Sequence, residues 1–161
     1  MRKFFIVLLL IGALVMGFIW KISHNVNIVR SIEYVCSLLQ QEYDLDLTTS
    51  DVLSMNYEPK YSRDYACVAE IQLSDEYTSH LSAFIDDDVS WLRGGNTDKI
   101  IETYIDPSLS YFDNLPALRN CCTQENSFTK LLIHDNDLPE LKFSLAVFNA
   151  DNATLFFFTV K

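Results

Sequence analysis

The chain opens with a long run of hydrophobic residues. Residues 4–20 contain no charge, and Arg2 and Lys3 precede them. A secretory signal needs about 7–15 apolar residues, whereas a membrane-spanning helix needs about 20 and at least about 17. The run is therefore long enough to stay in the membrane, and residues 1–23 are predicted to form an N-terminal transmembrane anchor or an uncleaved signal.

The charges on either side of this run predict its orientation. Arg2 and Lys3 lie before it, whereas only Lys21 follows it closely. The positive-inside rule then keeps the N-terminus in the cytoplasm. Cleavage after Gly17 is the alternative, and it would deliver the remainder to the same side. We therefore expect a single-pass membrane protein in which residues 24–161 form one domain outside the cytoplasm, most simply in a bacterial periplasm.

A helical pattern follows the anchor. Between residues 26 and 43, the apolar side chains recur every three or four positions, as expected for one face of an amphipathic helix. These positions are Ile28, Ile32, Val35, Cys36, Leu39 and Tyr43.

The next clear pattern has a period of two. Residues 65–73 alternate as in a strand with one buried face. Ser74 is a suitable N-cap for a following helix, and Asp75 and Glu76 suit the first turn of that helix. Residues 77–85 also alternate tolerably, so a second strand there is the alternative to the helix.

Three β-rich runs form the C-terminal third of the chain, at residues 128–134, 141–149 and 154–161. Short polar segments separate them, which predicts an antiparallel meander. The last run is apolar on both faces, so it is expected to be central in the sheet or covered on both sides. Between residues 94 and 126 the pattern is weak and predicts only short helices. The fold class is therefore α+β, with an N-terminal membrane helix, an amphipathic helix and a small antiparallel sheet with helices packed on one face.

The net charge of the chain after the anchor indicates which kinds of partner it can bind. After the anchor, nine basic residues stand against 22 acidic ones, a net charge of −13. Such a surface repels nucleic acid and anionic lipid headgroups and attracts a cationic protein. The alternative is that this acidity only keeps a small exported domain soluble. Nucleic-acid binding is not expected, and no cofactor is predicted.

Four cysteines, Cys36, Cys67, Cys121 and Cys122, are candidates for disulfides, because an even number in an exported domain favours oxidation. A bridge between the two adjacent cysteines would be strained. The favoured pairing therefore links Cys36 and Cys67 each to one of Cys121 and Cys122, which lie in a segment predicted to be irregular. The alternative is that Cys36 and Cys67 are buried thiols in the core.

Two groups of polar residues are candidate sites. Asp86, Asp87 and Asp88 are consecutive near the end of a predicted helix, where the helix dipole disfavours negative charge, so we expect them to contact a partner. His134, Asp135 and Asp137 are weaker candidates for a metal site. A turn between strands explains this second group more simply, so no metal site is predicted there.

No segment carries a recognisable catalytic motif, and no catalytic residue is predicted. The sequence favours a membrane-tethered, extracytoplasmic acidic binding module, possible examples being an immunity or inhibitor protein that recognises a basic protein. The alternatives are an accessory structural subunit of an envelope assembly and a hydrolase of the envelope that uses carboxylates and His134.

Overall fold

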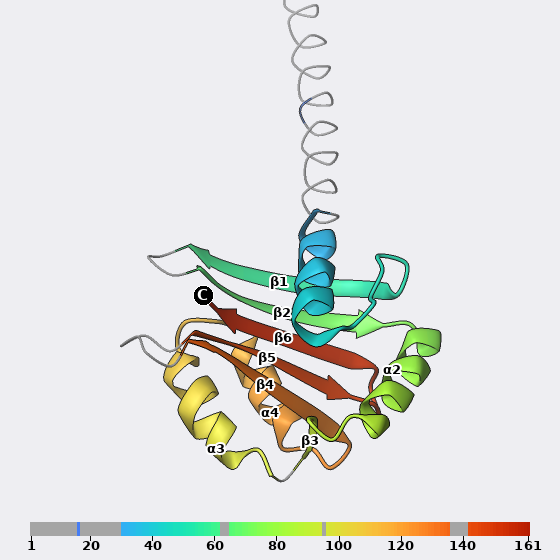
Figure 1. The fold of residues 1–161 in the computed structure, drawn as a ribbon. Coiled ribbons are helices and arrows are strands. Elements are labelled where there is room, and N and C mark those ends of the chain that lie inside the picture. The colour runs from blue at the N-terminus through green and yellow to red at the C-terminus, as the bar shows by residue number, and fades with distance from the viewer. Residues whose placement is uncertain (1–15, 17–29, 62–64, 95, 136–141) are drawn as a thin grey trace, which may run out of the picture.

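The computed structural model describes residues 16, 30–61, 65–94, 96–135 and 142–161 (Figure 1). Apart from Met16, which is helical, the predicted anchor lies outside these residues. Within the described parts of the chain, no helix combines the length and the apolar character needed to cross a membrane.

The centre of the fold is a six-stranded antiparallel sheet with the order β1-β2-β6-β5-β4-β3. Its α+β class and its C-terminal meander, β4-β5-β6, are confirmed. The strands are β1 (Val52–Tyr61), β2 (Tyr65–Leu73), β3 (Leu92–Arg93), β4 (Ser127–Asp135), β5 (Lys142–Asn149) and β6 (Thr154–Val160).

Helices cover both faces of this sheet, so the expectation that they pack on one face is wrong (Figure 1). Residues 30–43 form a helix that packs on the first face together with α2 (Asp75–Asp87). The second face is covered by the segments between β3 and β4. They are α3 (Asp98–Ile100), the π-helical turn η1 (Ile101–Ile105), the 3-10 turn η2 (Asp106–Ser108) and α4 (Leu115–Cys122).

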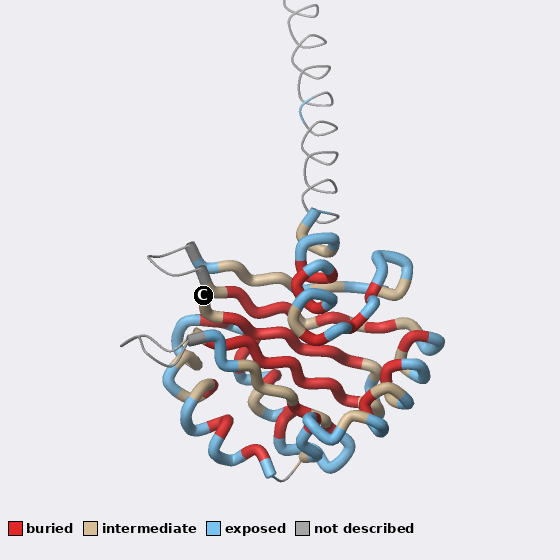
Figure 2. The backbone as a smooth tube through the Cα atoms, viewed as in Figure 1, coloured by how far each residue is buried: buried red, intermediate tan, exposed pale blue. Residues whose placement is uncertain are grey.

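The strand β6 shows why two helical layers are needed. Leu155 and Phe157 belong to the core cluster of the first face, whereas Phe156 and Phe158 belong to that of the second. All four side chains are buried (Figure 2). Because successive side chains of a strand point to opposite faces, an apolar strand of this kind requires cover on both sides. The prediction that the last strand is central in the sheet or covered on both sides is confirmed.

The junction between β2 and α2 follows its local sequence. Ser74 is the N-cap of α2, and its side chain accepts a hydrogen bond from the backbone N–H of Tyr77 at 3.2 Å. Tyr77, Leu81 and Ile85 form the buried face of the helix. The helix is confirmed, and the alternative of a strand over residues 77–85 is wrong.

The edge strand β1 was not predicted. Its residues alternate between apolar and polar from Leu53 to Tyr61, which is the pattern of a strand with one face against the core. It also contains Pro59, which is tolerated at the edge of a sheet because it donates no ladder hydrogen bond. Contacts to the second face hold it in place. The Glu58 carboxylate accepts hydrogen bonds from the backbone N–H groups of Asp113 (2.8 Å) and Asn114 (3.3 Å). Asn56 donates to the Asn114 side chain at 2.8 Å.

Candidate functional site

The most distinctive surface of the described domain is a group of carboxylates around α2. We call it the acidic face and define it as residues 44–51 and 74–88. These two segments contain no Lys or Arg. Their eight carboxylates are Asp44, Asp46, Asp51, Asp75, Glu76, Asp86, Asp87 and Asp88.

The two segments of the acidic face are adjacent in space. The backbone N–H of Ser74 donates to the carbonyl of Asp51 at 2.8 Å, and this bond joins the loop to the start of α2. The loop lies next to α2 in Figure 1. A side-chain contact within the loop fixes its shape, since the Asp51 carboxylate accepts from the backbone N–H of Thr48 at 2.9 Å. The carboxylates are therefore displayed by ordered backbone at one end of the sheet.

The negative charge of these carboxylates shifts the pKa values of neighbouring groups. Burial is the main cause that raises the pKa of Tyr77, and the negative charges of Asp51 and Asp46 raise it further. Burial also raises the pKa of Cys36 to about 11, again with a contribution from Asp51. Both shifts have the sign expected when a negative charge disfavours a second one nearby.

The three consecutive aspartates at the end of α2 have different surroundings. Asp86 and Asp87 are exposed. Asp88 is the C-cap of α2, and its carboxylate accepts from the Ser90 backbone N–H (2.9 Å), the Ser90 hydroxyl (2.6 Å) and the Lys130 ammonium (2.8 Å). These hydrogen bonds hold the pKa of Asp88 far below its usual range, and the bond from Lys130 contributes more than those from Ser90. Only Asp86 and Asp87 thus retain the exposure expected of a contact residue, while Asp88 is engaged within the fold.

Positive charge elsewhere does little to offset this surface. The described residues include 19 acidic and eight basic side chains. Half of the basic ones are engaged in ion pairs with carboxylates of the same chain. These are Lys60–Glu58 (3.3 Å), Arg119–Asp106 (2.7 Å), Lys130–Asp88 (2.8 Å) and Lys161–Glu42 (2.7 Å). The domain therefore presents a strongly negative field to an approaching protein.

His134 lies on β4 in a chain of hydrogen bonds that joins the three strands of the meander. Its Nε2 atom lies 2.7 Å from the Ser144 hydroxyl, which lies 2.8 Å from the Thr159 hydroxyl. The Thr159 hydroxyl donates to the carbonyl of Phe143 at 3.2 Å. Each hydroxyl has one proton, so Thr159 must accept from Ser144, and Ser144 must accept from His134. The Nε2 atom of His134 is consequently a donor in this chain.

This geometry does not match that of a hydrolase built on His134. A catalytic base must accept the proton of its nucleophile, and the nucleophile must reach a substrate. Here Nε2 donates to Ser144, and Ser144 is completely buried. The carboxylate of Glu42 approaches the same nitrogen, at 3.8 Å, rather than the opposite one. The arrangement instead fastens β4, β5 and β6 together.

The remaining metal candidates do not assemble a site in the part of the chain that the structure describes. Within that part, no group of three or more His, Cys, Asp or Glu side chains is placed to hold an ion. Asp135 is the last residue of β4, and Asp137 lies outside the described residues.

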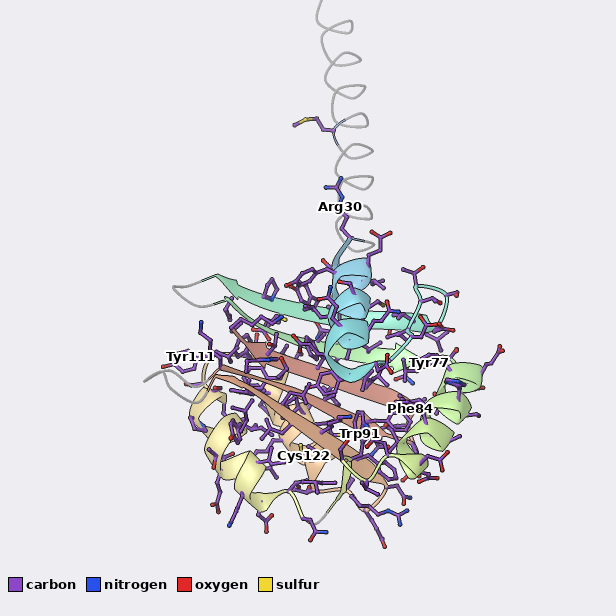
Figure 3. The ribbon with its side chains drawn as sticks, viewed as in Figure 1. Arg30, Tyr77, Phe84, Trp91, Tyr111 and Cys122 are labelled. Atoms are coloured by element: carbon purple, nitrogen blue, oxygen red, sulfur yellow. The ribbon has the colours of Figure 1, made fainter. Side chains whose placement is uncertain are left out.

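The cysteines lie in two separate places. Cys36 and Cys67 belong to the core cluster of the first face, whereas Cys121 and Cys122 end α4 on the second. All four are within the described residues, and none forms a disulfide. The sheet separates the two pairs, so the predicted bridges between them are not formed. Figure 3 labels Cys122 on the α4 side.

Burial also determines the chemistry of these thiols. It is the main cause that raises the pKa of Cys122 to about 12, and it raises the pKa of Cys121 as well. Since the thiolate is the reactive form, these cysteines are weak nucleophiles at neutral pH. Cys36 and Cys67 lie in the core as buried thiols, which was the alternative to the disulfides.

Sequence analysis missed two ion pairs, Lys130–Asp88 at the acidic face and Lys161–Glu42 outside it. Their partners are separated by many residues, so no local pattern indicates them.

Comparison of the chain with known protein families, with curated proteins and with solved structures finds no match in any of the three.

Proposed function

We propose that this protein is a membrane-tethered, extracytoplasmic binding module whose acidic face recognises a cationic protein. An immunity or inhibitor protein acting on a basic enzyme is the concrete form that we favour. The observation that carries the proposal is the acidic face itself, in which eight carboxylates and no Lys or Arg lie on two adjoining segments. Long-range attraction between such a face and a basic partner speeds the encounter and disfavours acidic competitors.

The edges of the sheet are less suited to recognition than this face. An exposed edge strand invites pairing with another chain unless charges, proline or a bulge interrupt it. The edge strand β1 has Pro59, Lys60 and an irregularity between Val52 and Ser54. At the other edge, β3 pairs only with Phe128 and Thr129, and the part of β4 beyond this pairing has an irregularity between Ile133 and Asp135. These features favour binding through side chains rather than through an added strand.

The test compares two double variants that remove the same amount of charge. D86N/D87N neutralises the exposed end of α2, and E102Q/E125Q neutralises two exposed carboxylates elsewhere. Full-length protein would be crosslinked in membranes of the native host, and its adducts would be identified by mass spectrometry. We expect a basic partner whose recovery falls about 3–10-fold in D86N/D87N and is retained in E102Q/E125Q.

Salt provides a second measurement in the same experiment. The difference between the two variants should shrink as ionic strength rises, because the Debye length is about 8 Å at 0.15 M and about 3 Å at 1 M. Equal losses in the two double variants would show that total charge matters rather than this surface. An acidic partner would contradict the proposal directly.

A further inference from the structure

The turn that follows α2 exposes apolar side chains that do not contribute to the core. Val89 is 98% exposed and Leu92 is 41% exposed, whereas Trp91 between them is only 6% exposed. An exposed turn normally carries Gly, Asn, Asp or Ser, whose backbone preferences or hydrogen bonds favour it. A β-branched valine offers none of these advantages. The exposed side chain of Val89 therefore contributes little to the stability of the fold.

Several contacts hold this turn in one conformation. We call residues 88–92 the clamped turn. The backbone N–H of Asp88 donates to the carbonyl of Ile85, and that of Trp91 donates to the carbonyl of Asp88, each at 3.1 Å. The Asp88 carboxylate holds Ser90 and Lys130, as described above. The Trp91 ring anchors the turn in the core, with its centroid 6.2 Å from that of Tyr43.

The clamped turn adjoins the exposed carboxylates of the acidic face. Asp86 and Asp87 precede it directly, and the last turn of α2 contains no basic residue to offset them. Residues 86–92 thus carry two exposed apolar side chains and two exposed carboxylates within one short, ordered segment. Protein interfaces commonly have an apolar centre with a polar rim, and a surface that is already ordered loses less entropy when it binds.

We propose that Val89 and Leu92 are the apolar centre of the contact with the cationic partner, and that Asp86 and Asp87 lie at its rim. The partner is then a protein with a shallow apolar depression surrounded by Lys or Arg. This inference rests on the proposed function and adds the anchoring residues to it. The carboxylates attract the partner from a distance, while the apolar pair slows its dissociation.

The test places a photoreactive benzoylphenylalanine at Ala83, an exposed residue of α2 one turn before Asp86 and Asp87. The same probe at Tyr111 is the positional control, since Tyr111 is 66% exposed and lies on the opposite side of the molecule in Figure 3. Full-length protein would be irradiated in membranes of the native host. We expect one adduct with a basic protein from position 83 and no such adduct from position 111.

Substitutions then separate the apolar centre from the charge. With the probe at Ala83, V89S should lower the yield of the adduct about fivefold or more. L53S is the matched control, because Leu53 is also exposed, at 66%, but lies on β1. It should leave the yield unchanged. Neither side chain is buried, so both variants should fold as the wild type does.

Each outcome decides between the two proposals. A yield that falls in D86N/D87N but not in V89S would overturn the apolar centre and leave the acidic face in place. A yield that responds to neither variant would overturn both. Equal losses in V89S and L53S, or the same adduct from Ala83 and Tyr111, would show that the clamped turn has no special role.

Discussion

The ion pair between Glu42 and Lys161 should be one of the strongest single links between the helix of residues 30–43 and the sheet. Only 9% of the Glu42 side chain is exposed. Its Oε1 atom lies 2.7 Å from the Lys161 ammonium. Its Oε2 atom is buried and has no hydrogen-bond partner among the described residues, and the Nε2 atom of His134 lies 3.8 Å from it. The substitution Lys161→Met would remove the ammonium group that faces this buried carboxylate.

The expected cost follows from burial. Removing one partner of a fully buried ion pair costs about 3–5 kcal/mol, because the remaining charge is left without compensation. Lys161 is 39% exposed, so water can reach its side of the pair. We therefore expect K161M to lower the free energy of unfolding by about 2 kcal/mol. The double variant E42L/K161M removes both charges and should lie within about 1 kcal/mol of the wild type.

Urea unfolding of the full-length protein in a mild detergent, followed by near-ultraviolet circular dichroism, would measure these differences. A shift in midpoint at constant slope would indicate a change in stability alone. E42L completes the double-mutant cycle, from which the coupling energy follows. A K161M variant as stable as the wild type would refute this account of the pair. So would a double variant that is less stable than K161M.

Three further predictions concern the clamped turn, the thiols and one strained residue. The pKa of Asp88 is depressed in the folded protein, so its pairing with Lys130 stabilises the fold above the ordinary aspartate pKa of about 4. This stabilisation is lost as the pH falls below that value. D88N should therefore be less stable than the wild type at pH 7, and the difference in stability should narrow in acid. Alkylation of native protein followed by mass spectrometry should label Cys122 far more slowly than alkylation of unfolded protein, because burial raises its pKa to about 12; equal rates would contradict its burial. Ala153 has a φ of 52°, which is unfavourable for any residue with a Cβ atom. A153G should stabilise the fold by about 0.5–1 kcal/mol, measured as a higher thermal midpoint. A150G, at a nearby position without positive φ, should not raise the midpoint.

Much of the fold could be predicted because neighbouring residues encode it. The junction of β2 and α2 needs only alternation, a serine cap and two acidic residues in the first turn, and all of these lie within a few positions of one another. The meander depends on three apolar runs with short connections, which bring consecutive strands side by side. The acidity of the domain follows from composition alone.

Contacts between distant segments decided the rest. The alternating residues of β1 are compatible with any position in a sheet, and its pairing with β2 and the bonds that Glu58 accepts from the start of α4 place it at the edge. Cys36 and Cys121 both lie at apolar positions, but the sequence does not show that they face opposite sides of one sheet. Asp86 and Asp88 look equivalent in the sequence. They differ because Lys130 lies on a strand that the fold brings next to only one of them. Local patterns thus determined most of the elements and the charge of this protein, while tertiary packing determined which of its carboxylates remain open to solvent and buried all four thiols.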